Sequence, residues 1–195
     1  MDSIKNRRSI RKYTDKMVSK KDIEEIIQAA MLAPSAKNRQ PWKYIVYTMD
    51  SKDRILDVME KGLIRERDGK CILPYSSRGL TDAFNTLKIM RQAPILIMVM
   101  NPGGFSPFDQ LIADDRITEI CDSLSIGASI QNMLLAATEK GIGSLWIANT
   151  CFAYTELEEY LEMPGQLVGA VILGYADEDP AMRPRKALED VIEYR

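Results

Sequence analysis

Residues 116–140 form the segment that most restricts how this chain can fold. Apolar residues recur there at the three- and four-residue spacing of an α-helix, and Gly141 is well suited to end the helix. The main stripe contains Ile117, Ile120, Leu124, Ala128, Gln131, Leu135 and Thr138, and Cys121, Ile130, Met133, Leu134 and Ala137 widen it. A helix that is apolar over so much of its circumference has to lie in the centre of the fold or at a contact between subunits.

Extended segments are predicted at four further places. The apolar run 95–100, bounded by Pro94 and Pro102, is typical of a strand that is covered on both faces. The β-branched and aromatic content of 43–48 and 167–175 predicts two more strands, and a short extended piece is expected over 144–148.

The remaining helices are predicted from their capping residues and apolar spacing. The spacing of Ser19 and Asp22 resembles a capping box, and the helix that follows has to stop before Pro34. Asp50 or Ser51 is expected to cap the next helix, and shorter helices are expected over 84–90 and 155–161. The glycines, prolines and serines of 61–81 predict a long loop, and the 195 residues are expected to form one domain, 1–195.

The absence of histidine excludes several kinds of chemistry. Ser-His-Asp and Cys-His machinery and histidine-liganded zinc all require an imidazole, and the sequence has none. Cys71, Cys121 and Cys151 are too scattered for a four-ligand metal site or a disulfide framework, so we expect no metal and free thiols. The net charge of -2 argues against nucleic-acid binding. No apolar run is long enough for a signal peptide or a membrane span, and a cytoplasmic protein is expected.

Three polar segments remain as candidates for a binding site. One contains Arg7, Arg8, Ser9 and Arg11, and a second, near the other end of the chain, contains Arg183 and Arg185. Guanidinium groups and a hydroxyl can bind a phosphate together, although a cluster of this kind can also be a solvated basic surface. The third segment, 33–41, is a polar loop whose prolines favour a preformed binding surface. Gly141-Ile142-Gly143 lacks the third glycine and the strand-to-helix order of a dinucleotide fingerprint, so a Rossmann fold is rejected.

Taken in order, several blocks of the sequence resemble the nitroreductase family of FMN-dependent oxidoreductases. The blocks span nearly the whole chain. They are 7–13 (RRSIRKY), 33–42 (APSAKNRQPW), 131–137 (QNMLLAA), 141–147 (GIGSLWI), 173–175 (LGY) and 183–189 (RPRKALE). The resemblance implies an α+β fold with a mixed central sheet flanked by helices, and an intertwined homodimer with FMN at the subunit interface.

The same resemblance implies a role for individual residues. Arg7, Arg8 and Ser9, joined by Arg183 and Arg185, are expected to hold the FMN phosphate and ribityl chain. Arg11 corresponds to a cation near the N1/C2 edge of the flavin, where it stabilises the reduced ring. Four residues correspond to a loop that reaches the flavin from the partner subunit, namely Pro34, Ser35, Ala36 and Asn38. Trp146, Ile147 and Ala148 correspond to backbone along the ring, and Asn85 and Lys88 to contacts with its pyrimidine edge.

The implied activity is a ping-pong transfer of hydride from NAD(P)H through flavin N5 to an electron-poor acceptor, such as a nitroaromatic or a quinone. In such a reaction the cofactor carries the chemistry and no protein nucleophile is needed, which agrees with the absence of histidine. The alternatives are a dehalogenase-type or flavin-degrading branch of the family, a flavin-binding storage or redox-sensing protein, and a dimer with a purely structural role. Segment 61–81 departs from larger members, and it is the region that shapes the substrate side.

Overall fold

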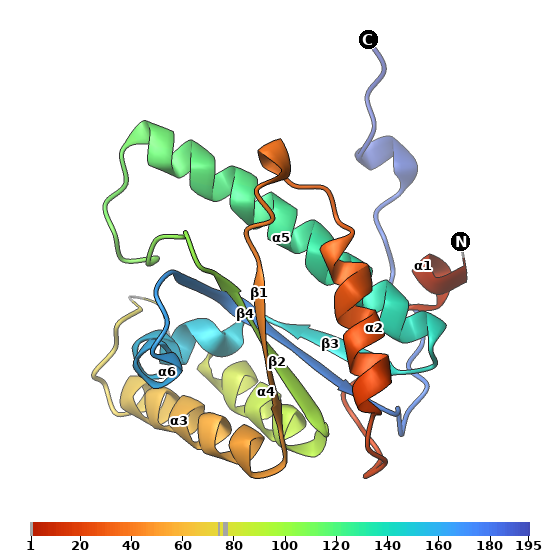
Figure 1. Ribbon diagram of the computed structural model, residues 1–195, viewed down its shortest axis with the longest axis horizontal. Helices are drawn as coiled ribbons and strands as arrows, with labels where there is room; N and C mark the ends of the chain where they lie inside the picture. Colours follow the sequence, from red (N-terminus) through yellow and green to blue (C-terminus); the bar gives the residue numbers. More distant parts are fainter. Residues whose placement is uncertain (1, 74, 76–77) are drawn as a thin grey trace.

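The computed structural model describes residues 2–73, 75 and 78–195, and a four-stranded sheet lies at its centre (Figure 1). The strands are β1 (Lys43–Thr48), β2 (Ile95–Asn101), β3 (Gly143–Ile147) and β4 (Gln166–Gly174), in the order β1-β2-β4-β3. Every pairing between these strands is antiparallel, and the parallel component expected of a mixed sheet is limited to an isolated bridge between Ser9 and Ser144.

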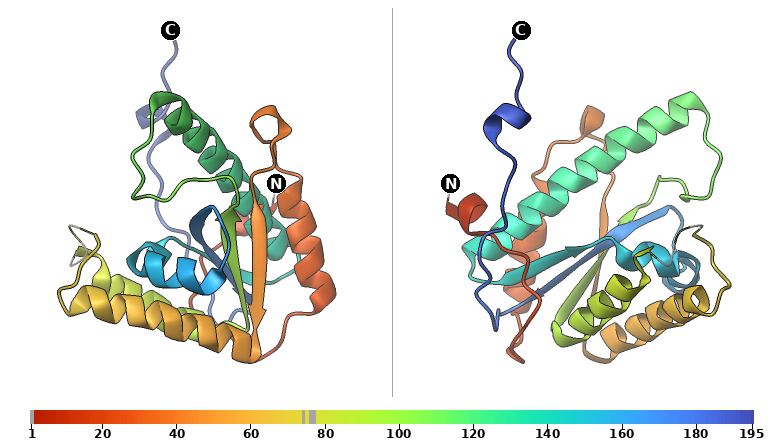
Figure 2. Two further views of the ribbon diagram at one scale, coloured as in Figure 1. Left: turned by 60° about the vertical axis from the view of Figure 1, so that its left-hand side comes forward. Right: turned by 180° about the vertical axis from the view of Figure 1, so that it is seen from behind.

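Helices cover both faces of the sheet, which gives three layers (Figure 2). One face is covered by α2 (Lys20–Met31) and α5 (Ala113–Glu139), and the other by α3 (Met49–Arg67), α4 (Leu80–Gln92) and α6 (Tyr154–Leu161). Strand β2 explains this arrangement, because all seven of its residues are buried and successive side chains point to opposite faces. Its apolar run was therefore predicted correctly as a strand covered on both sides.

The helix α5 confirms the predicted long helix and has two apolar sides with different neighbours. Its inner side, which includes Ile126, Ile130 and Met133, packs against the sheet. The predicted main stripe lies on the other side, where Ile117 is 60% exposed and Leu124 is 71% exposed in this chain. A Schellman motif ends the helix: the Ile142 N–H donates to the Ala137 carbonyl at 2.8 Å, and Gly141 has a φ of 67°.

Two helices, α3 and α4, have boundaries that differ from the sequence prediction. The helix α3 continues to Arg67, where a loop from residue 61 was predicted, because Leu63 is buried and Gly62 lets the helix contact Ala153 closely. Thr48 is its N-cap instead of Asp50 or Ser51. The helix α4 begins at Leu80, four residues before the predicted start. Residues 74, 76 and 77 of the predicted loop lie outside the described residues.

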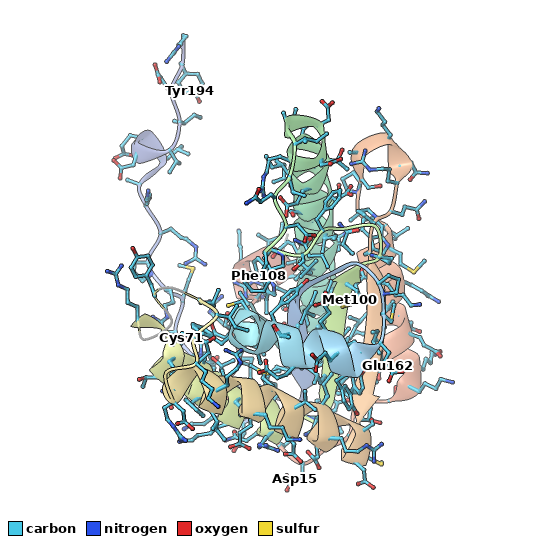
Figure 3. The ribbon with its side chains drawn as sticks, turned by 90° about the vertical axis from the view of Figure 1, so that its left-hand side faces the viewer. Asp15, Cys71, Met100, Phe108, Glu162 and Tyr194 are labelled. Atoms are coloured by element: carbon cyan, nitrogen blue, oxygen red, sulfur yellow. The ribbon has the colours of Figure 1, made fainter. Side chains whose placement is uncertain are left out.

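The two ends of the chain are joined to each other. The Thr14 N–H donates to the Tyr175 carbonyl at 2.9 Å, and the Asp177 N–H donates to the Lys12 carbonyl at 3.0 Å. The first helix, α1 (Asp2–Asn6), was not predicted from the sequence. Beyond Glu178 the chain forms an extended arm that leads away from the sheet to Tyr194 (Figure 3). In the described part of the chain, no helix has both the length and the apolar character required to cross a membrane.

Candidate functional site

The pairing of the two ends brings the two arginine clusters together. Segment 7–11 comes just before the paired residues, and segment 180–185 comes just after them. Between them these two segments enclose a cavity of about 290 Å³. The cavity is lined by Arg7, Arg8, Ser9, Arg11, Pro180, Ala181, Met182, Arg183 and Arg185. The five residues that the resemblance assigns to the phosphate and ribityl chain therefore face one space together with Arg11, although 172 positions separate Arg11 from Arg183.

The five guanidinium groups of this cavity are free to bind an anion. Within the described ranges, no carboxylate lies within 4.0 Å of any of them. Several instead donate to main-chain carbonyls, such as Arg8 to Lys5 at 2.7 Å and Arg185 to Arg183 at 3.0 Å. Such a concentration of positive charge, in a protein with a net charge of -2, favours a ligand with a doubly charged group.

Glu178 and Tyr13 hold the backbone of this cavity in place. The Glu178 carboxylate accepts the backbone N–H of Arg11, and that of Lys12 at 3.2 Å. The Tyr13 hydroxyl donates to the Ile10 carbonyl at 2.7 Å. Burial raises the pKa of Tyr13 well above its ordinary value, and the nearby Glu178 charge raises it further. Tyr13 therefore remains a neutral hydrogen-bond donor at physiological pH.

A second cavity, of about 340 Å³, adjoins the first at Arg11, which lines both. One wall is the edge of the sheet, formed by Leu145, Trp146, Ile147 and Ala148, and the other is helix α4. Trp146 is 52% exposed on this edge strand. The Ile10 N–H donates to the Ser144 carbonyl at 3.0 Å, so the N-terminal segment pairs with the start of β3 and the end of the strand faces the cavity.

The α4 wall contains some of the predicted residues and omits one. Asn85 lines the second cavity together with Asp82, Thr86 and Ile89, which are spaced so that they share one helix face. Lys88 is exposed and lines neither cavity, because it points about 100° away from Ile89 around the helix axis. The expected contact of Lys88 with a flavin ring is therefore not supported by its place in this chain.

The loop that carries Pro34, Ser35, Ala36 and Asn38 lies apart from both cavities and has a rigid conformation. Three of its residues have a left-handed backbone, with φ of 52° at Lys37, 54° at Asn38 and 50° at Gln40. Such backbone is unfavourable for residues other than glycine and is maintained only by surrounding contacts.

Contacts with α5 and within the loop supply that support. The Arg39 guanidinium donates to the Asp122 carboxylate at 2.7 and 3.0 Å, and this contact raises the pKa of Arg39. The Ala36 N–H donates to the Ser125 hydroxyl at 3.3 Å, and the Gln40 N–H donates to the Ser35 hydroxyl at 3.0 Å. The loop is thus preformed and fixed to the N-terminal half of α5 (Figure 1).

One chain therefore holds the predicted site residues in two separate groups. The loop 33–41 is fixed to α5 at Asp122, whereas the arginine cavity lies near the other end of α5, where the Ser3 hydroxyl donates to Glu139 at 2.7 Å. Seventeen residues of helix separate these two points, which corresponds to about 25 Å at 1.5 Å per residue. The loop of one chain cannot reach the arginine cavity of the same chain.

Five residues that line the second cavity were missed by the sequence analysis: Asp82, Thr86, Ile89, Leu145 and Asn149. The Asn149 amide donates to Asp82 at 2.9 Å and to Thr86 at 3.0 Å, so the segment after β3 is tied to α4. Asp82 was overlooked because the helix was predicted to begin at Phe84. An earlier start would have placed Asp82, Asn85, Thr86 and Ile89 on one helix face.

The described residues contain no group of three His, Cys, Asp or Glu side chains that is able to hold a metal ion. The three cysteines form no disulfide. The site therefore consists of arginines, hydroxyl and amide groups, the Asp82 carboxylate and the free edge of a β-strand.

Together these features define an α+β protein with an elongated groove, cationic at one end and bounded by a strand edge at the other. The chain belongs to the nitroreductase family, whose model matches residues 4–175. A relative from Archaeoglobus fulgidus, provisionally named an NADH dehydrogenase/NAD(P)H nitroreductase, is 32% identical over 184 residues, which cover 90% of this chain and 84% of the relative.

Solved structures agree with this assignment. A BluB-like flavoprotein from Clostridium difficile 630 is 29% identical, with a TM-score of 0.80, and the match covers 100% of this chain and 97% of that one. A provisionally named nitroreductase from Desulfovibrio desulfuricans, solved in complex with FMN, is 25% identical with a TM-score of 0.73, and the match covers 100% of this chain and 95% of that one. The predicted family and its fold are thus confirmed.

Proposed function

We propose that this protein is an FMN-dependent oxidoreductase that transfers hydride from NAD(P)H to an electron-poor acceptor of the nitroaromatic or quinone type. The observation that carries the proposal is the pair of cavities that meet at Arg11, one cationic and one lined by a strand edge and a helix. FMN has a matching form, a phosphate joined through a ribityl chain to a planar ring. The FMN complex of the Desulfovibrio structure and the name of the Archaeoglobus relative support the same cofactor and reductant.

The residues of the groove fit FMN in both shape and charge. Arg7, Arg8, Arg183 and Arg185, with the Ser9 hydroxyl, would hold the phosphate, since a dianion matches guanidinium groups that have no carboxylate partner. Trp146, Ile147, Ala148 and Asn85 would lie along the ring. When bound, FMN supplies the redox chemistry: hydride from NAD(P)H enters at N5 and passes to the acceptor after the nicotinamide has left, which is a ping-pong cycle.

The protein contributes binding, orientation and electrostatics. Arg11 lies where the phosphate end and the ring end of the groove meet, so its charge acts on the near edge of the ring and stabilises negative charge there. Glu178 positions Arg11 through the backbone, and its carboxylate makes no ion pair with the guanidinium. No imidazole or protein nucleophile is required.

We further propose that the working unit, comprising residues 1–195 of two chains, is an intertwined homodimer. The outer stripe of α5 leaves Ile117, Ile120 and Leu124 between 52 and 71% exposed, and apolar residues in such a row favour burial against a second copy. A two-fold axis through the middle of α5 makes the two helices antiparallel. The loop 33–41 of one chain then lies near the arginine cavity of the other, which brings Pro34, Ser35, Ala36 and Asn38 to the flavin.

The C-terminal arm supports the same assembly. Met182, Leu188, Val191 and Tyr194 are exposed on it, and an extended apolar segment of this kind is stable only against another surface. The arm reaches far from its own sheet (Figure 3), so a partner subunit is the surface that we propose for it. A dimer in the cytoplasm has direct access to NAD(P)H, and we place the protein there.

The absorbance of the purified protein tests the function. We expect the purified protein to absorb in the blue part of the visible spectrum, as oxidised flavin does. Anaerobic addition of NADH or NADPH should remove this absorption. Addition of a nitroaromatic or a quinone should then restore it. A colourless protein that FMN does not reconstitute would contradict the proposal. A yellow protein that neither nicotinamide reduces would favour storage or redox sensing, and loss of the flavin itself in air would favour the flavin-degrading branch.

A further inference from the structure

The cavity proposed for the flavin ring has one acidic residue among its ten lining residues. Arg11 and Asp82 are its charged members, and the others are apolar or carry uncharged amide and hydroxyl groups. The adjoining phosphate cavity is lined by arginines and has no acidic member. Among the described residues, Asp82 is therefore the single carboxylate in the lining of the two cavities.

Asp82 and Arg11 lie at opposite ends of the ring cavity. Gly174 has two neighbours, Pro94 and Tyr13. Pro94 comes shortly after the C-terminal end of α4, and Tyr13 comes shortly after Arg11. Arg11 is therefore placed at the C-terminal end of α4, near Ile89. Asp82 is seven residues before Ile89, about 10 Å along the helix. Strand β3 runs along the cavity in the same direction, from the Arg11 end to the Asp82 end. It starts beside Ser9 and ends before Asn149, whose amide donates to Asp82.

The Asp82 carboxylate has an oxygen available for a ligand. Its Oδ2 atom accepts the Asn149 amide at 2.9 Å, and that amide also donates to Thr86 at 3.0 Å. Within the described part of the chain, the Oδ1 atom has no hydrogen-bond donor and the carboxylate has no ion-pair partner. The Asn149 contact restrains this exposed carboxylate in the lining of the cavity.

We propose that Asp82 determines which electron acceptors this protein uses. The charge of its carboxylate favours acceptors that carry a cation or an N–H or O–H donor near the reducible group, and disfavours acceptors that carry a carboxylate or phosphate. The inference rests on the proposed function, because it assumes that the flavin extends from the arginines and leaves the Asp82 end of the cavity to the acceptor.

A purely structural role for Asp82 predicts different behaviour. Asp82 lies in the first turn of α4, where a carboxylate stabilises the helix dipole, and it also holds Asn149. Loss of either function would reduce the stability of the protein, or the turnover of all acceptors by the same factor. A role in specificity changes the ratio between acceptors that differ only in charge.

Three nitrobenzenes of similar shape measure that ratio: 4-nitrobenzoate, 4-nitrobenzamide and the 4-nitrobenzyl trimethylammonium cation. Each undergoes the same balanced reaction, in which ArNO₂, NAD(P)H and H⁺ give ArNO, NAD(P)⁺ and H₂O. Asp82→Asn removes one charge and leaves the other charges of the protein in place. The kcat/KM values of this variant are therefore compared directly with those of the wild type. We expect the kcat/KM ratio of the anion to the cation to rise about tenfold, and the value for the neutral amide to change less than about twofold.

Two further variants serve as controls. Asp82→Glu keeps the charge and should keep most of the wild-type preference, whereas Asp15→Asn removes a carboxylate that lines neither cavity and should leave the ratio unchanged. The inference is wrong if Asp82→Asn shifts the ratio no more than Asp15→Asn does.

A binding measurement separates this inference from the proposed function. If the wild type reduces none of the three compounds, the proposed function fails. Binding can still be measured, because nitroaromatics quench tryptophan fluorescence and Trp146 lines the same cavity. Quenching titrations of the wild type and Asp82→Asn then report the affinity for the anion and the cation without turnover. A similar tenfold change in the ratio of affinities supports the role of Asp82, and an unchanged ratio overturns it.

Discussion

At the scale of single residues, the five arginines of the groove have two distinct functions in the proposed enzyme. Arg185 lines the phosphate cavity alone, whereas Arg11 lines both cavities. A cation beside the phosphate contributes equally to oxidised and reduced FMN, so it affects affinity. A cation beside the ring favours the reduced form, which carries more negative charge, so it affects the reduction potential.

Replacing each arginine separates the two effects. We expect Arg185→Ala to weaken FMN binding about 10- to 100-fold, since a hydrogen bond to a charged group contributes about 1.5–3 kcal/mol. Arg11→Met should weaken binding less but lower the flavin potential by about 30 mV or more, which corresponds to about 1.4 kcal/mol for a two-electron couple. Fluorescence titration with FMN and a dye-equilibrium measurement of the potential provide the two values.

Arg54→Ala is the matched control, because Arg54 is exposed, has no ion pair among the described residues and lies outside both cavities. It should change neither quantity. If Arg11→Met leaves the potential unchanged, its charge does not act on the ring. Unchanged FMN affinity in Arg185→Ala would remove that residue from the phosphate site.

At the scale of secondary structure, the end of α5 shows how one residue sets the direction of the chain. Gly141 has a φ of 67°, which allows the helix to stop and β3 to begin two residues later beside Ser9. A Cβ atom at this position would meet no atom within 4 Å, so a substitution there strains only the backbone. We expect Gly141→Ala to lower the free energy of unfolding by about 1 kcal/mol, as measured by urea denaturation.

Gly103→Ala tests whether that loss arises from the left-handed backbone. Gly103 also has open space around its Cβ position but is not among the glycines with positive φ. Its substitution should change the stability by less than about 0.5 kcal/mol. Equal losses in the two variants would show that the Schellman motif does not depend on glycine.

The same elements show which parts of the fold can be predicted from sequence. The strands and α5 were located to within a few residues because burial imposes a periodic pattern on them. The end of α3 was missed because its last turns contain Gly62 and several charged residues, which read as a loop. Its helical state depends on burial of Leu63 and on contact with Ala153, and such distant packing partners leave no local pattern.

At the scale of the whole molecule, the predicted site residues show a similar division. The arginines were identified from their clustering, but only the pairing of segment 12–14 with 175–177 brings the clusters together. Asp82 and Asn149 were missed because each is unremarkable in its own segment. Their importance arises from a hydrogen bond between α4 and the segment after β3, which sequence spacing does not encode. The loop 33–41 was found as a motif, and its distance from the arginines becomes evident only along α5.

In the proposed dimer, that distance makes dimer formation a condition for FMN binding, and Leu124→Asp tests this proposal. Leu124 is 71% exposed in one chain, so an aspartate there should barely change the stability of the monomer, but it would bury a charge between two α5 helices. We expect the variant to sediment as a monomer and to lose most of its FMN, because the partner's loop is then missing from each groove. Met49→Asp, on the opposite face of the sheet and 68% exposed, should remain dimeric and yellow. A Leu124→Asp protein that stays dimeric would show that Leu124 is not buried at the subunit interface. A monomer that keeps its flavin would show that one chain completes the site alone.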